Sequence, residues 1–293
     1  MKRRSLIGRL LHPLGGPKPR QTEMARRKLR LAKLLERNAE GDRPDLFAVV
    51  SWGCAATKWV ATTLNAHPQV LCLHNLRFYQ ECFTPNQPRL GDLPYMNMLQ
   101  YAGRGYVLAG DVQGIDRGSV PLLKEHFGER FRAAAVVRDP HQRLLSQLGL
   151  FERYDAGEGI WSGLEYLQQL PGFPQVAPHY GDPRRRHFMH AANLLNAVLE
   201  ERAHCRLFRA EDLTARPEAL VELLDYLSGG KLAQQRRWAE EAVARPADVA
   251  SDAGPRRGVS ESWQLEILRA LVRPEARQAY SDLGYSLPRE WFP

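Results

Sequence analysis

The 293-residue sequence lacks the features that would place it in several large classes of protein. No apolar run approaches the ~18 residues that a membrane-spanning helix needs, so no such helix is predicted. The four cysteines show no CxxC spacing and predict neither a metal site nor a clear disulfide framework; they are Cys54, Cys72, Cys82 and Cys205. A reducing compartment follows as the expectation, and we predict a cytoplasmic protein.

Acidic residues are scarce in only one part of the chain, its N-terminal arm. Residues 1–37 hold 12 lysines and arginines against 2 acidic residues, a net charge of +10, whereas the remaining 256 residues carry −2. We interpret residues 1–44 as a basic arm with a predicted helix, able to make weak contact with an anionic surface. The alternative is a solvated tail. No specific nucleic-acid partner is predicted.

From residue 45 onward, apolar runs alternate with helical patterns. Strands are predicted over 46–51, 70–74, 106–111, 131–137 and 205–208. Helices are predicted over 57–65, 119–127, 141–153, 187–202, 217–227, 232–244, 263–272 and 274–283, and a long surface loop over 171–186. This order predicts one α/β domain over 45–293, a three-layer α/β/α fold with a central, mostly parallel sheet. Ligands of such sheets bind at the carboxyl ends of the strands.

The segment after the first strand, SWGCAATKW (51–59), is typical of a phosphate-binding turn. Small residues let the backbone approach an anion, and the following helix begins with free N–H groups. A Walker motif would need a second glycine before Lys58 and a serine or threonine after it, and both are missing. The alternative is an ordinary tight turn. The residues predicted to bind a cofactor here are Gly53, Cys54, Ala55, Ala56, Thr57, Lys58 and Trp59.

A second candidate anion site follows the strand 131–137. Arg138 emerges at the same edge of the sheet, Asp139 is suited to cap the next helix and Pro140 to begin it. Ser146 lies two turns into that helix. An arginine fork and a hydroxyl could together hold a second phosphate, separate from the first.

The segment VVRDPHQRLLSQLGLF resembles the 3′-phosphate-binding segment of sulfotransferases that use 3′-phosphoadenosine 5′-phosphosulfate (PAPS). The 51–59 loop is similar in place to the 5′-phosphosulfate loop of that family, and NAHP (65–68) resembles its glycan- and tyrosine-modifying branches. LFRAEDLTARPEALVELLDYL (207–227) and GPRRGVSESW (254–263) are similar to two later family segments. The resemblance implies a P-loop-NTPase-like sulfotransferase fold, PAPS as co-substrate, no metal, and 3′-phosphate binding by Arg256, Arg257 and Gly258.

The first loop departs from the family pattern. Cys54 stands where the family usually has a basic residue, and Lys58 stands at the second threonine position. Our hypothesis is that Lys58 supplies the lost charge from a different direction. The alternative is that Lys58 faces solvent and another residue neutralises the sulfonate.

Transfer to a hydroxyl requires a group that takes the hydroxyl proton. His74 ends the second strand at the place where the tyrosylprotein-modifying relatives carry a glutamate base, so the resemblance favours His74. Asp111, which ends YVLAGD, is the second candidate for this base or for orienting the substrate. The aromatic residues of 75–100, Tyr95 among them, could line the acceptor side or belong to the core.

The resulting prediction is a sulfotransferase that moves a sulfonate from PAPS to an acceptor hydroxyl and releases 3′,5′-ADP. The basic segment HYGDPRRRH (179–187) weakly favours a carbohydrate acceptor, or is simply an exposed loop. One alternative is a catalytically degenerate member of the fold, or a polyanion-binding protein that acts through its basic arm. A nucleotide-dependent kinase is the other, and the missing Walker residues argue against it.

Overall fold

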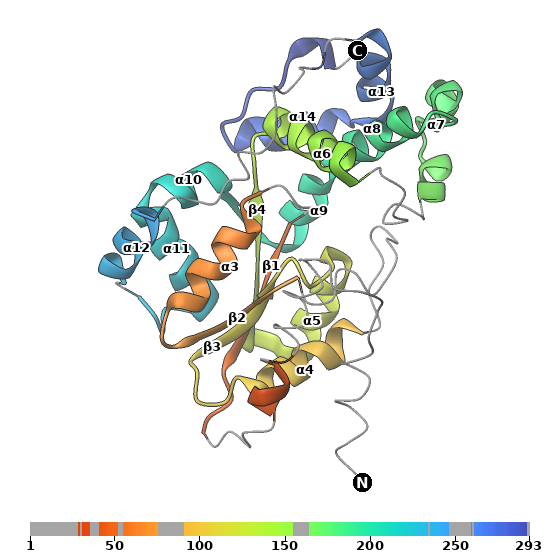
Figure 1. Cartoon of the computed structure of the whole chain (residues 1–293). Coiled ribbons are helices and arrows are strands. Elements are labelled where there is room, and N and C mark those ends of the chain that lie inside the picture. The colour runs from red at the N-terminus through yellow and green to blue at the C-terminus, as the bar shows by residue number, and fades with distance from the viewer. Residues whose placement is uncertain are drawn as a thin grey trace.

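A computed structural model gives the fold of the chain (Figure 1). It describes residues 29, 31–35, 41–51, 55–75, 91–154, 164–233, 235–245, 259 and 261–291, with the backbone alone over 150–154. Within these ranges, every helix is too short or too polar to cross a lipid bilayer.

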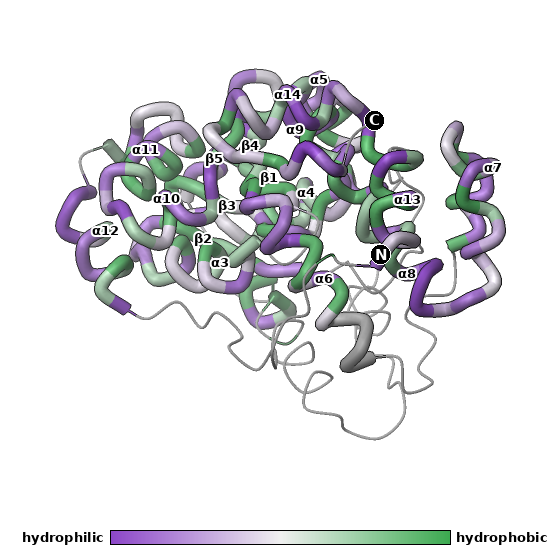
Figure 2. Tube along the Cα trace, turned by 90° about the horizontal axis from the view of Figure 1, so that it is seen from above, coloured by the Kyte–Doolittle hydropathy of each residue, from purple (hydrophilic) through white to green (hydrophobic). Residues whose placement is uncertain are grey.

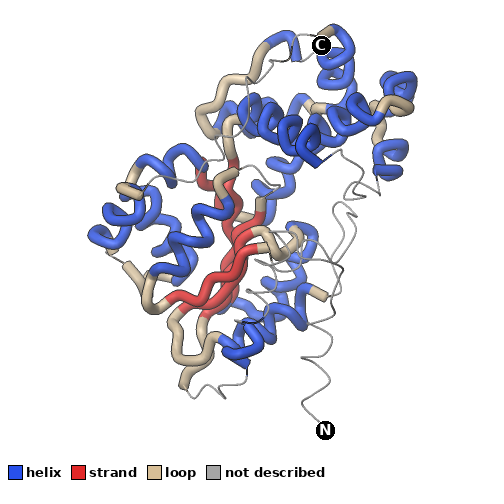
Figure 3. Tube along the Cα trace, in the orientation of Figure 1, coloured by secondary structure: helices blue, strands red, loops and turns tan. Residues whose placement is uncertain are grey.

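Five strands form one parallel sheet at the centre of the molecule (Figure 3). They are Asp45–Val50 (β1), Val70–His74 (β2), Leu108–Val112 (β3), Phe131–Val137 (β4) and Arg206–Arg209 (β5), in the order β2-β3-β1-β4-β5. The predicted parallel sheet is therefore confirmed. The chain leaves β1 toward β2 on one side and leaves β4 toward β5 on the other. The carboxyl ends of β1 and β4, the adjacent strands whose connections run in opposite directions, are where such sheets bind ligands.

Helices cover both faces of the sheet, which confirms the three-layer α/β/α architecture. Side chains of β1 alternate between the faces, so that Phe47 and Val49 enter one apolar core and Leu46 and Ala48 the other. The first core is completed by Thr57–Ala66 (α3), Ala210–Ala215 (α10), Pro217–Ser228 (α11) and Arg236–Val243 (α12). The second is completed by Asp92–Ala102 (α4) and Val120–Phe127 (α5).

A third apolar cluster lies in a group of helices beyond the carboxyl edge of the sheet (Figure 1). Figure 2 looks down on this group, whose helices carry green apolar and purple polar turns, as expected where one face of a helix is buried. Its α-helices are Pro140–Tyr154 (α6), Phe173–Val176 (α7), Pro183–Asn193 (α8), Ala197–His204 (α9), Ser262–Leu271 (α13) and Pro274–Asp282 (α14). Two 3₁₀ turns flank α5, Arg117–Ser119 (η1) and Gly128–Arg130 (η2). The other 3₁₀ turns of the described residues are Leu164–Gln169 (η3), Ala177–His179 (η4), Leu194–Asn196 (η5) and Arg289–Trp291 (η6).

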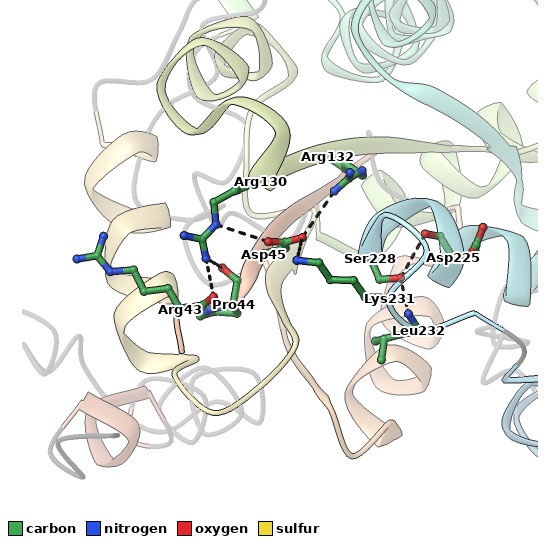
Figure 4. Close-up of polar contacts among 9 residues, drawn as sticks. All are labelled: Arg43, Pro44, Asp45, Arg130, Arg132, Asp225, Ser228, Lys231 and Leu232. Atoms are coloured by element: carbon green, nitrogen blue, oxygen red, sulfur yellow. Dashed lines mark hydrogen bonds and ion pairs between the residues drawn. The ribbon is translucent and has the colours of Figure 1, made fainter. Parts of the chain in front are cut away.

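An ion cluster closes the opposite, amino edge of the sheet (Figure 4). The Asp45 carboxylate, about 6% exposed, lies 2.8 Å from Lys231 Nζ, 3.6 Å from Arg130 Nε and 3.8 Å from Arg132 Nη1. Gly229 is left-handed (φ 61°), and a Cβ there would come within 2.4 Å of the Arg132 guanidinium. This cluster therefore ties the first residue of β1 to the start of β4 and to the turn after α11.

Several predicted elements need correction. The predicted loop 171–186 instead contains α7, η4 and the start of α8, because Val176 is buried against the third cluster. The predicted helix 187–202 is divided by η5 into α8 and α9. Helix α4 was not predicted at all. In the N-terminal segment, residues 31–35 are helical and Leu31 is fully buried in the α4 and α5 core. The domain boundary at residue 44 stays a prediction.

Candidate functional site

The carboxyl ends of the three neighbouring strands β2, β3 and β1 lie at one level. Val112 of β3 pairs with His74 of β2 on one side and with Val49 of β1 on the other. Because side chains alternate, His74 shares the α3 side of the sheet with Cys72, whereas Asp111 shares the α4 side with Ala109. The two candidate bases therefore belong to opposite faces of the sheet.

His74 lies beside the first turn of α3. Its Nε2 is 3.4 Å from the hydroxyl of Thr57, a buried residue. That hydroxyl donates a hydrogen bond to Oε1 of Gln113, at 2.8 Å. The structure thus brings together the predicted residues Thr57 and His74, and adds Gln113, which the sequence analysis did not single out.

Asp111 is fully buried at the end of β3. One carboxylate oxygen accepts a hydrogen bond from the backbone N–H of Asn75 (3.0 Å), and the other accepts one from the hydroxyl of Tyr95 (2.5 Å). Gly114 approaches the carboxylate so closely that a Cβ would lie 2.4 Å from it. Through these contacts Asp111 holds the ends of β2 and β3 together. Tyr95 belongs to the core, since it is 5% exposed.

Arg138 and Ser146 lie side by side after β4, because Arg138 Nη1 donates to the serine hydroxyl at 3.1 Å. Both side chains are half-buried. Asp139 caps α6 as predicted, since its Oδ1 accepts from the backbone N–H of Gln142 at 2.8 Å. Val50 of β1 pairs with Ala135 of β4, so Arg138 lies three residues, or about 10 Å, beyond the level at which β1 ends.

Two residues outside the predicted site support this segment. Oε1 of Glu211, in the RAEDL stretch after β5, accepts a hydrogen bond from the backbone N–H of Asp139 at 3.0 Å. The hydroxyl of Tyr285 donates to the carbonyl of Val137 (3.1 Å) and is also hydrogen-bonded to Glu211. Burial and Glu211 raise the pKa of Tyr285, which keeps the phenol neutral. No signal in the sequence pointed to Tyr285, whereas Glu211 belongs to a recognised motif.

Lys58 points in a different direction from Thr57, as consecutive helical residues differ by about 100° around the axis. It is exposed and lines a pocket of about 340 Å³ between α3 and α12, together with Trp59 and Trp238. Glu241 and Arg245 line the same pocket. The structure therefore separates Lys58 from the Thr57 and His74 pair. Trp59, 9% exposed, forms an aromatic wall of the pocket.

Residues 52–54 of the first loop and 254–258 of the late basic loop lie outside the described residues. Ala55 is buried and Ala56 adopts a left-handed conformation (φ 55°) immediately before α3. The predicted residues without a described position are Gly53, Cys54, Arg256, Arg257 and Gly258. The described residues include no cluster of three or more histidine, cysteine or acidic side chains suited to a metal ion. A reaction without metal stays a prediction.

The basic run on α8 packs against the helix that follows the late loop. The guanidinium groups of Arg184 and Arg185 lie 5.8 and 5.4 Å from the ring centre of Trp263, and Arg184 also pairs with Glu261 (3.4 Å). Arg186 lies over the ring of Tyr180 instead. These arginines therefore have protein partners, and a role toward an acceptor stays a prediction.

Comparison with known proteins finds a distant likeness among solved structures. No protein-family model matches the chain, and no curated protein matches it. Among solved structures, the chain is similar to a sulfotransferase from Alicyclobacillus acidocaldarius, with 14% identity and a TM-score of 0.44 over 85% of this chain and 99% of the other. These values are too low to assign this chain to a family.

Proposed function

We propose that the protein is a sulfotransferase that takes a sulfonate from PAPS, passes it to an acceptor hydroxyl and releases 3′,5′-ADP. The observation that carries the proposal is the Arg138–Ser146 pair at the end of β4, next in the sheet to β1 and the turn that leads to Thr57. Two anion sites at neighbouring strand ends match a nucleotide with separate 3′ and 5′ phosphates. The four family-like segments lie in the expected order along the chain.

In this proposal, the turn before α3 and the Thr57 hydroxyl hold the 5′ end, and Arg138 with Ser146 holds the 3′-phosphate. The acceptor oxygen forms a bond to sulfur as the bond from sulfur to the 5′-phosphate oxygen breaks, and the acceptor proton passes to His74. The protein contributes mainly positioning and charge stabilisation. Asp111 is buried and already bonded, so we assign it to positioning.

The finer assignments belong to the same proposal. The late-loop residues Arg256 and Arg257 add charge at the 3′-phosphate, and a carbohydrate is the favoured acceptor. Lys58 faces the α12 side, so we assign it no contact with the sulfonate. A catalytically degenerate or polyanion-binding protein is the second candidate. It is favoured by the cysteine at position 54, where the family usually has a basic residue.

The test is transfer of labelled sulfonate from PAPS to a panel of sugar, peptide and small phenolic hydroxyls. We expect 3′,5′-ADP release that depends on an acceptor and not on added magnesium, and a loss of ~100-fold or more in kcat for His74→Ala, as for removal of a general base. Binding of PAPS without turnover on any acceptor would favour the degenerate protein. Consumption of ATP with magnesium would favour a kinase.

A further inference from the structure

The two peptide groups that flank Arg138 are each held by a side chain from another part of the chain. Before Arg138, the carbonyl of Val137 accepts a hydrogen bond from the hydroxyl of Tyr285 at 3.1 Å. After it, the backbone N–H of Asp139 donates to Oε1 of Glu211 at 3.0 Å. The Tyr285 hydroxyl is also hydrogen-bonded to Oε2 of Glu211. The two side chains therefore form one continuous brace around Arg138, the Glu211–Tyr285 brace.

The Glu211–Tyr285 brace acts where regular secondary structure leaves the backbone without support. β4 ends at Val137 and α6 begins at Pro140, so Arg138 and Asp139 lie between a strand and a helix. Pro140 has no N–H, and the first N–H groups of a helix have no partner within it. The sheet and the helix thus leave open how the peptides beside Arg138 are turned, and the direction of its side chain depends on that turn.

Tyr285 is itself held firmly enough to fix a neighbouring peptide. It is 6% exposed in the third apolar cluster, and the guanidinium carbon of Arg209 lies 4.5 Å from the centre of its ring. Gly284, with φ 77°, turns the chain back after α14 and delivers Tyr285 to the end of β4. Burial, together with Glu211, raises the pKa of Tyr285, so the hydroxyl keeps the proton that its two acceptors share.

We propose that Glu211 and Tyr285 are positioning residues that aim Arg138 at the 3′-phosphate of the nucleotide. This inference rests on the proposed sulfotransfer and adds two residues to its 3′-phosphate site. A guanidinium makes two parallel hydrogen bonds to a phosphate only when its plane is correctly oriented. A turn of the peptides beside Arg138 moves that plane, so loss of the brace weakens binding although neither brace residue touches the nucleotide.

The test is calorimetric binding of 3′,5′-ADP to Tyr285→Phe and Glu211→Ala variants of the full chain. Each should bind about tenfold more weakly than the wild type, as for one lost hydrogen bond that orients a charged group. Glu211→Gln should recover most of the affinity, because its amide oxygen still accepts from the Asp139 N–H. Tyr280→Phe is the matched control with wild-type affinity, since it removes a buried hydroxyl that bonds to neither peptide group.

A double-mutant cycle with Arg138→Ala separates positioning from a purely structural role. If the brace acts through Arg138, Tyr285→Phe should weaken binding about tenfold in the wild type and less than about twofold in the Arg138→Ala background. A purely structural role would weaken binding equally in both backgrounds or not at all. Equal losses in the two backgrounds, or unchanged affinity in both Tyr285→Phe and Glu211→Ala, would overturn the inference.

The order of the Arg138 side chain in the free protein tests the brace without any ligand. It is measured by ¹⁵N relaxation of the guanidinium Nε. We expect an ordered Nε in the wild type and in Tyr280→Phe, and a more mobile one in Tyr285→Phe and Glu211→Ala. Equal order in all of these proteins would overturn the inference. If the wild type binds no 3′,5′-ADP, the proposed function fails, while the order of Nε still decides whether the brace aims Arg138.

Discussion

His190 offers a quantitative test of the helices beyond the carboxyl edge of the sheet. It belongs to α8, is 1% exposed, and its Nδ1 lies 2.6 Å from the hydroxyl of Tyr166. Burial, and to a smaller extent the nearby His187, lowers the pKa of His190 to about 3. Burial also raises the pKa of Tyr166 to about 12, so both groups are neutral in the folded protein between pH 5 and pH 8.

The sign follows from which state binds more protons. In the unfolded chain the pKa of His190 is near 6.5. Below that pH the unfolded state therefore binds a proton that the folded state does not bind. The free energy of unfolding therefore keeps its full value above about pH 6.5 and decreases as the pH falls below it. From pH 7 to pH 5, His190 alone removes about 2 kcal/mol of unfolding free energy, and any folded-state pKa below about 4 gives the same figure.

Urea unfolding at pH 7 and pH 5 measures this loss in the wild type and in His190→Asn. Asparagine keeps a polar partner for Tyr166 but does not titrate. The variant should be less stable at pH 7, yet lose about 2 kcal/mol less than the wild type between the two pH values. Equal losses in the two proteins would mean that His190 is charged or exposed when folded, which would refute the packing of α8.

Three further predictions concern the sheet and its two edges. Arg138→Ala should weaken 3′,5′-ADP binding by about 30-fold or more in calorimetry, since a charge-assisted bond to the 3′-phosphate is lost. Asp45→Ala should cost about 2 kcal/mol in urea unfolding, less in 1 M salt, because three cations lose their partner; a cost unaffected by salt would contradict this. Gly110→Ala should cost about 3 kcal/mol, because a Cβ would meet the Phe47 carbonyl at 2.1 Å, whereas Gly149→Ala, with open space, should not destabilise.

The strands were predictable because the apolar runs are short and bounded. The run that ends at Val137 is followed by Arg138, Asp139 and Pro140, and a change from strand to helix at this point was legible in the residue types. Helix α4 was missed because its apolar and polar residues do not alternate with a clear helical period. Met96 and Leu99 are nevertheless buried in the core on that side of the sheet. The segment 171–186 was mistaken for a loop because its prolines and glycines hid the burial of Val176.

The candidate site was predictable where one residue type carries the chemistry and unpredictable where contact depends on packing. Arg138 and Ser146 could be paired because one ends a strand and the other lies two turns into the helix that follows. Gln113 could not be found, because its importance lies in a left-handed backbone and in a hydrogen bond to Thr57, 56 residues away in the sequence. Tyr285 likewise reaches the end of β4 from the far end of the chain.

The central claim is that two neighbouring strand ends hold the two phosphates of one nucleotide. Thermal unfolding with 3′,5′-ADP, 5′-AMP and ATP, each with and without magnesium, tests it most directly. Ligand at ~100 times its Kd adds about 2.7 kcal/mol of stability to the state it binds. We expect stabilisation by 3′,5′-ADP, none by 5′-AMP and no dependence on magnesium. No stabilisation by 3′,5′-ADP, or equal stabilisation by 5′-AMP, would contradict the claim.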